Sequence, residues 1–150
     1  MEFRVLGPDD LAHMYAILSL FGRAFADPDS YESAQPDAAY LTRLLGGSGF
    51  LAVAALHDGR VVGGLAAYVL PKFEQARNEL YIYDLAVDEP FRRQGVATGL
   101  IDTVRRVAAE RGVWMIYVQA DREDAPAIAL YSKLGMREDV LHFDIRPHSS

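Results

Sequence analysis

The 150-residue chain has no cysteine and only one tryptophan. Without cysteine it can form no disulfide and no thiolate metal site, and it has no cysteine nucleophile. It contains no apolar run long enough to span a bilayer. Its first residues, Met1 to Val5, lack the basic and then apolar pattern of a signal peptide. We therefore expect a cytoplasmic protein that does not associate with membranes.

Positive charge is also scarce, because 15 lysine and arginine residues face 21 aspartate and glutamate residues, for a formal net charge of −6. This balance argues against nucleic acid as the main partner, since binding to the phosphate backbone needs a basic surface. It suits a cationic substrate, although the same charge would also serve solubility alone. Hydrophobic residues make up 51% of the chain, and we find no linker or repeat. The composition predicts one soluble domain over residues 1–150.

Hydrophobic patterning predicts an α/β order of elements. Helices are expected after the turn at residues 7–10, over residues 37–45, after Gly95, and up to residue 134. Asp58-Gly59 between two apolar runs indicates a hairpin, and Gly63-Gly64 within the second run indicates a bulge or a close neighbour. The polar segment 26–36 is either a solvated loop or a substrate-facing wall with an acidic rim around Tyr31. Strands are predicted over residues 3–6, 50–56, 60–70, 79–87, 113–119 and 140–145.

The stretch 81–99 is the most informative part of the sequence. An apolar strand is broken at Pro90, a short basic glycine loop follows, and the loop leads into a helical pattern. The first amides of a helix have no partner within the helix and lie at its positive end, so they attract anions. A phosphate or pyrophosphate group fits this loop. An ordinary capped helix start would have the same pattern, and spacing alone leaves both interpretations open.

Two blocks of the sequence resemble the GNAT superfamily of N-acetyltransferases. The first is Arg92-x-x-Gly95-x-Ala97 after a strand that ends in Leu85-Ala86-Val87, and the second runs over residues 125–136. The resemblance implies a single-domain α/β fold with a mixed, mostly antiparallel central sheet flanked by helices. It also implies acetyl-CoA as the acetyl donor.

The resemblance also implies which residues hold the coenzyme. The backbone of Leu85, Ala86 and Val87 would pair with the pantetheine arm. Asp124 stands where the superfamily often has an asparagine; it can cap a helix but cannot donate a hydrogen bond as an amide does. The pyrophosphate would be held by Arg92, Arg93, Gln94, Gly95, Val96, Ala97 and Thr98.

Transfer of an acetyl group to an amine needs an acid for the departing thiolate and a base for the amine. By resemblance Tyr131 is the acid, whereas its spacing alone would suit a core aromatic residue. Glu79 and Asp84 are the candidate bases, and in a regular strand they would point to opposite faces unless a bulge intervenes. Asp84 is favoured because a carboxylate within an apolar strand is unfavourable to bury without partners. A structural aspartate, with a water chain as the base, is the alternative.

Several segments resemble the aminoglycoside 3-N-acetyltransferases of the GNAT type. They include P-K-F-E-Q over residues 71–75, Y-I-Y-D-L-A-V over 81–87 and H-F-D-I over 142–145. The resemblance implies an aminoglycoside acceptor acetylated at the 3-amino group of its deoxystreptamine ring, and hence antibiotic resistance. His142 is either close to the acceptor amine or a surface histidine. The carboxylates that would bind the ammonium groups are Glu79, Asp84, Asp121 and Asp144.

The four histidines show no metal-ligand spacing, so we expect no metal. The resemblance is compatible with a homodimer, because late strands of such folds often pair across subunits. Two other functions remain open. One is an acetyltransferase acting on a polyamine or on a protein amine, and the other is a non-catalytic sensor that binds acetyl-CoA.

Overall fold

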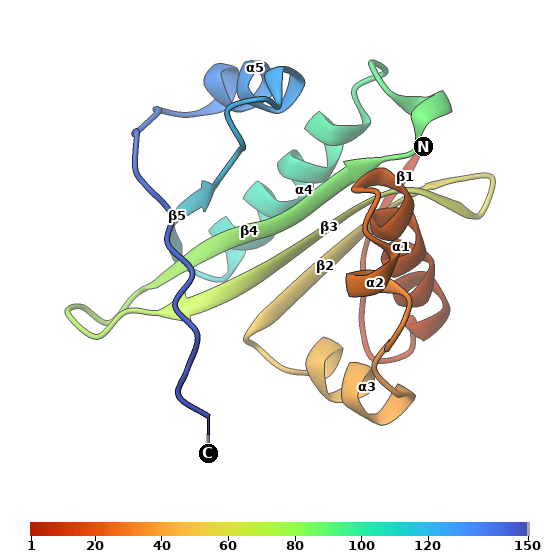
Figure 1. Cartoon of the computed structure of the whole chain (residues 1–150), viewed down its shortest axis with the longest axis horizontal. Coiled ribbons are helices and arrows are strands. Elements are labelled where there is room, and N and C mark those ends of the chain that lie inside the picture. Colours follow the sequence, from red (N-terminus) through yellow and green to blue (C-terminus); the bar gives the residue numbers. More distant parts are fainter. Residues whose placement is uncertain (150) are drawn as a thin grey trace. The chain divides into compact units, whose positions relative to one another are not determined.

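The structure of the protein, a computed structural model, describes residues 1–149 (Figure 1). The chain divides into two compact units, Met1–Gln119 and a second that begins at Ala120, and each is described by itself. The first unit contains β1 (Glu2–Val5), α1 (Leu11–Ala24), α2 (Pro28–Tyr31), α3 (Ala38–Gly46), β2 (Phe50–His57), β3 (Arg60–Pro71), β4 (Asn78–Val87), the 3₁₀ turn η1 (Glu89–Phe91), α4 (Val96–Glu110) and β5 (Val113–Val118). The second contains α5 (Ala125–Leu134).

One five-stranded sheet with the order β1-β2-β3-β4-β5 forms the centre of the first unit. The pairs β1–β2, β2–β3 and β3–β4 are antiparallel, and the pair β4–β5 is parallel. The β2–β3 hairpin turns at Asp58 and Gly59, which both have positive φ angles, as the Asp-Gly pair predicted. The expected α/β fold with a mixed, mostly antiparallel sheet is confirmed.

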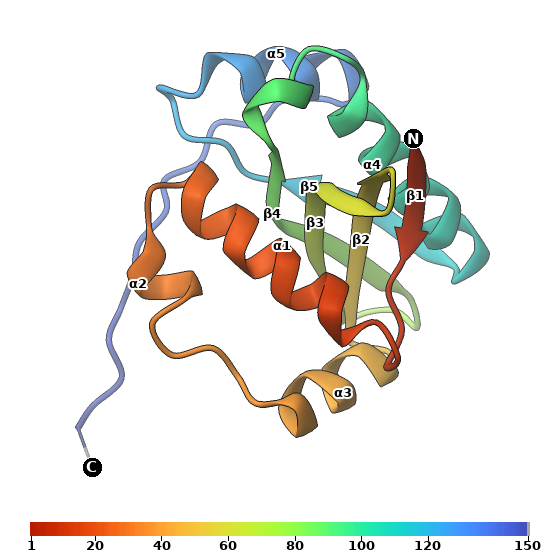
Figure 2. The same cartoon turned by 90° about the vertical axis from the view of Figure 1, so that its right-hand side faces the viewer.

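Helices cover both faces of the sheet, with α1 on one face and α4 on the other (Figure 2). Two adjacent glycines of β3 show how closely they pack. A Cβ atom at Gly64 would lie 2.9 Å from Ile17 of α1, and one at Gly63 would lie 3.0 Å from Val96 of α4. Because successive residues of a strand point to opposite faces, the Gly63-Gly64 pair admits a helix on each side. The close neighbour that these glycines predicted is confirmed, and the β2–β3 register shift nearby supplies the bulge.

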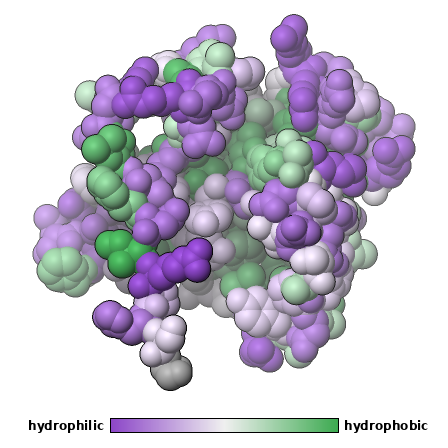
Figure 3. Space-filling view, in the orientation of Figure 1, coloured by the Kyte–Doolittle hydropathy of each residue, from purple (hydrophilic) through white to green (hydrophobic). Residues whose placement is uncertain are grey.

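Hydrophilic residues cover much of the surface shown in Figure 3, and hydrophobic residues are exposed there in separate small groups.

At the far end of the β3–β4 hairpin Phe73 is 98% exposed, and the guanidinium of Arg77 lies 3.6 Å from the ring centre of Trp114. Within residues 1–149 no helix has the length and apolar character needed to cross a membrane.

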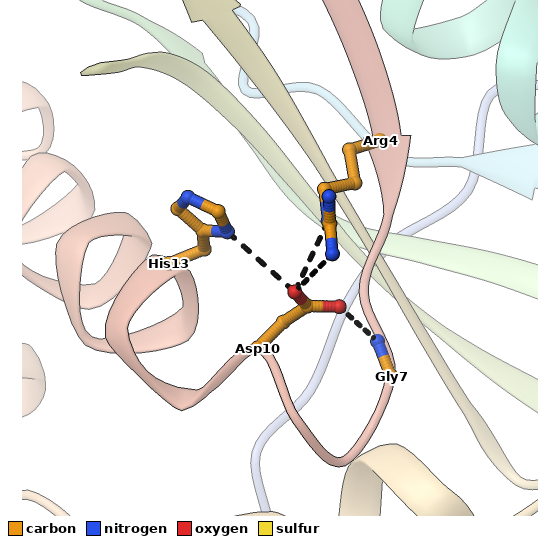
Figure 4. A network of polar contacts seen from close by, with 4 residues as sticks. All are labelled: Arg4, Gly7, Asp10 and His13. Atoms are coloured by element: carbon orange, nitrogen blue, oxygen red, sulfur yellow. Dashed lines mark hydrogen bonds and ion pairs between the residues drawn. The ribbon is translucent and has the colours of Figure 1, made fainter. Parts of the chain in front are cut away.

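A network of polar contacts fixes the entry into α1 (Figure 4). The buried side chain of Asp10 accepts a hydrogen bond from the Gly7 amide at 2.8 Å and one from Arg4 Nε at 3.0 Å. The Gly7 amide, followed by the Arg4 guanidinium, lowers the pKa of Asp10 below its usual value. His13 lies 3.7 Å from the same carboxylate. The network ties β1 to the helix that covers the sheet.

Two segments differ from the sequence-based expectations. Segment 26–36, expected as a loop, contains the short helix α2, which Asp27 caps by accepting a hydrogen bond from the Ser30 amide. The strand predicted over 140–145 is wrong, because residues 136–149 form no helix or strand. A strand needs a neighbour for its backbone groups, and no strand of residues 1–149 pairs with this segment. Its apolar side chains are between 67% and 89% exposed, namely Val140, Leu141, Phe143 and Ile145.

Candidate active site

The basic glycine loop ends where α4 begins, as the sequence predicted. Gly95 precedes the helix with a φ angle of +82°, a conformation that favours glycine, and Arg93 adopts a φ of +62° in the same loop. The first backbone bond of α4 runs from the Gly99 amide to the Gly95 carbonyl at 2.9 Å. The amides of Val96, Ala97 and Thr98 therefore lie at the open end of the helix, where an anion is stabilised. A pocket of about 340 Å³ opens beside this end, lined by Met1, Phe3, His57, Gln94, Gly95 and Val96.

Beside this loop, β4 has a free edge. The parallel pairing with β5 ends at Ile82, opposite Val118, and within residues 1–149 no strand pairs with the rest of β4 on that side. On the other side, the Asp88 amide bonds to the Val62 carbonyl, which makes Gly63 and Val87 a pair without mutual hydrogen bonds. Leu85 and Val87 consequently present their amides and carbonyls to the free edge. An extended ligand that carries amide groups can pair there like an additional strand.

Arg92 connects the edge to the loop. Its Nε donates a hydrogen bond to the Val87 carbonyl at 2.9 Å, so this carbonyl is already used. The amide of Val87 and both backbone groups of Leu85 are left for a ligand. Gln94 similarly donates its side-chain amide to the Pro90 carbonyl at 3.0 Å. These two contacts hold the loop in shape, so that its positive charge is fixed close to the end of α4.

A bulge in β4 places the side chains of Glu79 and Asp84 on the same face of the sheet. The register runs from Ala66 opposite Asp84 directly to Ala67 opposite Ile82, so Tyr83 is the extra residue. Because of this residue, Asp84 shares a face with Tyr81 and Glu79 although regular alternation would separate them. Asp84 lies two residues before Ala86, which packs in the core that α1 covers. Both candidate bases thus point to the α1 face.

Four tyrosines extend along this face beyond the area covered by α1, and we call them the tyrosine row. Tyr68 and Tyr81 are directly opposite each other in the β3–β4 register, and the ring of Tyr83 lies 5.6 Å from each of them. Tyr117 of β5 stacks on Tyr81 at 4.6 Å. Burial raises the pKa of Tyr68 and that of Tyr81, so both phenols remain neutral near pH 7. The row presents aromatic rings in both edge-on and stacked arrangements together with their hydroxyl groups, which suits a polar ring-shaped ligand.

Asp84 lies at the end of this row, where it is half-buried. Its Oδ2 accepts a hydrogen bond of 2.8 Å from the hydroxyl of Tyr31, the last residue of α2. Burial raises the pKa of Asp84 above its usual value, and the hydrogen bond from Tyr31 opposes this rise. A carboxylate with a raised pKa binds a proton more readily, as a general base for an amine requires. This contact also brings segment 26–36 next to Asp84, and its role as a substrate-facing wall stays a prediction.

Glu79 has a different environment. Its carboxylate forms an ion pair of 2.6 Å with Lys72, which follows β3, and Lys72 also lies 3.5 Å from Glu74. The pair with Glu79, followed by the other glutamate, raises the pKa of Lys72, so that it stays charged. Because Glu79 is already paired with a cation, it is less available than Asp84 to take a proton from an acceptor.

The remaining predicted residues belong to the second unit. Asp124 caps α5 by accepting a hydrogen bond of 3.2 Å from the Ala127 amide, which confirms its capping role. Burial, together with the Asp124 charge, raises the pKa of Tyr131, so this phenol carries its proton at neutral pH. Asp121 is exposed, and His142 is bonded to Asp144 at 2.8 Å. The roles assigned to these residues by resemblance stay predictions. Within residues 1–149 no group of three or more His, Asp or Glu side chains is arranged to hold a metal ion.

Sequence reasoning gave no functional role to Tyr31 itself or to any member of the tyrosine row. The signal available for the row was the alternation Tyr81-Ile82-Tyr83 in a strand next to one that contains Tyr68, since alternate residues share a face. Tyr31 stands in a polar segment, and its contact with Asp84 spans 53 positions of the chain. No local pattern predicts such a contact.

The loop, the free strand edge and the sheet define the class of the protein. The model of the acetyltransferase (GNAT) family matches residues 14–136, and the chain belongs to this family. Two solved structures are similar over almost the whole chain, and both are aminoglycoside acetyltransferases from an uncultured soil metagenomic sample. The first, HMB0005, is 53% identical with a TM-score of 0.94 and covers 99% of this chain and 100% of its own. The second, meta-AAC0020 in complex with sisomicin, is 31% identical with a TM-score of 0.88 and covers 98% and 96%.

The chain is also similar to the ribosomal protein bS18-alanine N-acetyltransferase of Escherichia coli strain K12. The two are 28% identical over 85 residues, which is 57% of this chain and 56% of that protein. The chain therefore spans about half the length of the curated relatives it matches.

Proposed function

We propose that the protein transfers the acetyl group of acetyl-CoA to an amine of an aminoglycoside antibiotic, at the 3-amino group of the deoxystreptamine ring. The observation that carries this proposal is the position of Asp84. It is a half-buried carboxylate with a raised pKa, it lies between the tyrosine row and the free edge of β4, and the coenzyme loop follows the same strand. Support for the substrate class comes from the two soil acetyltransferases, one of which was solved with sisomicin.

The coenzyme fits the groups that the structure provides. Acetyl-CoA, when bound, supplies an acetyl thioester that an amine nitrogen can attack. The amides at the start of α4, with Arg92 and Arg93, would hold its pyrophosphate. The free groups of Leu85 and Val87 would pair with the extended pantetheine arm. These residues would position the donor next to the face that carries Asp84.

The chain's own side chains would then move the protons. Asp84 takes a proton from the acceptor nitrogen, directly or through a water molecule, which leaves the lone pair of the amine free to form the new C–N bond. When the C–S bond breaks, the hydroxyl of Tyr131 would give its proton to the departing sulfur. The second proton, which the nitrogen loses as the amide forms, would return to the Tyr131 phenolate through water. The tyrosine row offers aromatic faces and hydroxyl groups to the acceptor rings, and the aromatic faces also attract their ammonium groups.

The test is a thiol-release assay with acetyl-CoA and four acceptors: gentamicin, kanamycin, spermidine and a peptide with an N-terminal alanine. We expect turnover with the aminoglycosides to exceed that with spermidine and the peptide by at least about tenfold in kcat/KM. NMR spectra of the acetylated product identify the modified nitrogen. Acetylation at another amino group would contradict the 3-amino assignment and leave the substrate class intact, whereas absence of aminoglycoside turnover would refute the proposal.

A second candidate is acetylation of a protein N-terminus. It is favoured by the similarity to the ribosomal protein alanine N-acetyltransferase, although that similarity covers 85 residues. The alanine peptide in the assay separates the two functions. Preferential turnover of the peptide would establish this candidate, and tight acetyl-CoA binding without any turnover would indicate a sensor.

A further inference from the structure

The contact between Tyr31 and Asp84 joins a short helix to the central strand. The Tyr31 hydroxyl donates a hydrogen bond to Oδ2 of Asp84 at 2.8 Å. Of the hydrogen bonds within residues 1–149, this is the one that the Asp84 side chain accepts, and Oδ1 is left for an external group. Burial raises the pKa of Tyr31, and its bond to Asp84 raises it further, so the phenol remains a donor throughout the neutral range.

Packing holds the Tyr31 ring in place. Phe21, which is only 1% exposed, meets it edge-on at 5.8 Å, and Phe25 lies 5.7 Å from it. The two phenylalanines also stack on each other at 5.4 Å. A ring fixed on two sides by aromatic neighbours has few rotamers available, so its hydroxyl points to one place.

The backbone around Tyr31 is equally well held. The chain leaves α1 through Ala26 at a φ of +50°, and the Asp27 amide bonds back to the Gly22 carbonyl at 3.0 Å. The Glu32 amide closes α2 by bonding to the Pro28 carbonyl at 2.8 Å. Although α2 has only four residues, it is braced at both ends.

We propose that Tyr31 is the positioning residue of Asp84: it occupies Oδ2 and so presents Oδ1 to the acceptor amine. This inference rests on the proposed function, because it assigns the base of that reaction its orientation and charge. It also gives segment 26–36 a role, since any movement of α2 would release the carboxylate.

The groups around Asp84 explain why the single hydroxyl of Tyr31 can influence the ionisation of this carboxylate. From β3 and β4 they are the phenols of Tyr68, Tyr81 and Tyr83, and from α2 it is Tyr31. The α1 residues packed around Tyr31 are the phenylalanines, which carry no charge. The carboxylate of Asp27 acts on Tyr31 and disfavours its ionisation. Tyr31 is thus the group that offsets the effect of burial on Asp84.

The experiment compares Tyr31→Phe with Tyr15→Phe. Tyr15 is the matched control, because its hydroxyl also makes a 2.8 Å hydrogen bond, to the Pro36 carbonyl at the end of the same segment, and does not touch Asp84. The first readout is the titration of Asp84 followed by carboxyl ¹³C NMR and assigned with Asp84→Asn. The second is the pH profile of kcat/KM with gentamicin.

Removal of the Tyr31 hydroxyl takes away a hydrogen bond to the ionised form, so the pKa of Asp84 rises. We expect the titration midpoint to move up by about one pH unit in Tyr31→Phe and to stay in place in Tyr15→Phe. The acidic limb of the rate profile should move in the same direction, which makes kcat/KM about tenfold lower at a pH below both midpoints. The KM for acetyl-CoA should stay unchanged.

Equal shifts in both variants, or an unmoved midpoint in Tyr31→Phe alongside normal wild-type turnover, would overturn the inference and leave the proposed function standing. If the unmodified chain acetylates no aminoglycoside while the midpoint still moves, the proposed function fails and takes the catalytic role of Tyr31 with it. The NMR spectra also show whether each variant is folded.

Discussion

Asp10 is buried and Asp84 is half-buried, and the protein surrounds these two carboxylates in opposite ways. Asp10 is bound by a backbone amide and by a guanidinium, which lower its pKa. Asp84 is bound by one phenol among aromatic rings, and burial raises its pKa. The first aspartate is most stable as an ion and ties β1 to α1. In the second, burial disfavours the ionised form and so raises its affinity for a proton.

The difference suggests that the two aspartates serve different purposes: Asp10 stabilises the fold, and Asp84 serves the proposed reaction. Both aspartates lie on the side of the sheet that α1 covers. The partners of Asp10, Gly7 and Arg4, are close to it in the chain, whereas Tyr31, the partner of Asp84, is 53 positions away. A carboxylate with satisfied ionic partners stabilises the native state, whereas a carboxylate without a cation reduces stability and is retained for chemistry. We therefore expect substitutions at the two sites to affect different properties.

The largest effect is expected for Asp84→Asn. Loss of the general base should lower kcat by about 10²- to 10⁴-fold, while the melting temperature stays the same or rises. Steady-state kinetics and differential scanning calorimetry on the same preparation measure both. Asp102→Asn, at an exposed position on α4, is the control and should change neither. Full activity of Asp84→Asn would move the base to another group or to water.

Asp10→Asn should have the opposite profile. The amide cannot satisfy both the Gly7 amide and Arg4, so the free energy of unfolding should fall by about 1–3 kcal/mol. For a chain of this size the melting temperature would drop by roughly 2–4 °C for each kcal/mol. The kcat of the folded protein should stay within about twofold of wild type. The exposed neighbour Asp9 gives the control Asp9→Asn, and an equal loss of stability there would refute the role of the network.

The pH dependence of stability should also differ in sign. The pKa of Asp10 in the folded state lies below its ordinary value of 3.8. The stability that Asp10 contributes is therefore fully present above pH 3.8 and is lost as the pH falls through the folded-state pKa. The pKa of Asp84 in the folded state lies above 3.8. Ionised Asp84 therefore lowers the free energy of unfolding, and this loss of stability is absent below pH 3.8 and develops as the pH rises through the folded-state pKa.

Urea unfolding of the two Asn variants and wild type, from pH 3 to 7, would measure this contrast. Compared with wild type, the free energy of unfolding of Asp10→Asn should be lower, and this difference should shrink below pH 3.8. The free energy of unfolding of Asp84→Asn should exceed that of wild type by an amount that grows above pH 3.8. Parallel curves for the two variants would contradict the contrast between the sites.

The smallest effect is expected for Glu79→Gln. Glu79 is paired with Lys72 on the surface, and such pairs contribute little to stability, so the melting temperature should barely change. Because Lys72 already neutralises this carboxylate, kcat should fall far less than in Asp84→Asn. A comparable loss in both variants would restore Glu79 as a candidate base. Lys72→Met serves as the companion variant, since it frees Glu79 from its partner.

Local signals in the sequence were sufficient for most of the fold. The Asp58-Gly59 turn, the Gly63-Gly64 pair and the loop before α4 each depend on backbone conformations that a few neighbouring residues determine. The segment 140–145 shows the limit of such signals, because weak alternation alone does not provide a partner strand. The helix α2 was too short for a periodic pattern.

The candidate site was less predictable because it depends on contacts between distant residues. The carboxylates could be named from the chain, but their common face depends on the extra residue Tyr83, and a bulge of this kind has no sequence signature here. The partner of Asp84 comes from α2 and the partner of Glu79 from the end of β3. Only the folded chain reveals which carboxylate has a cation and which does not.

The unpaired edge of β4 has a further consequence for the behaviour of the protein in solution. Free amides and carbonyls on a strand edge are a template onto which another chain can add, which promotes self-association. The carbonyl of Val87 is capped by Arg92, but the backbone groups of Leu85 are not. The pantetheine arm of bound coenzyme would occupy these backbone groups and so prevent another chain from pairing with the edge. The protein should therefore aggregate more slowly on storage or heating when saturating coenzyme A is present, beyond the gain expected from its melting temperature alone.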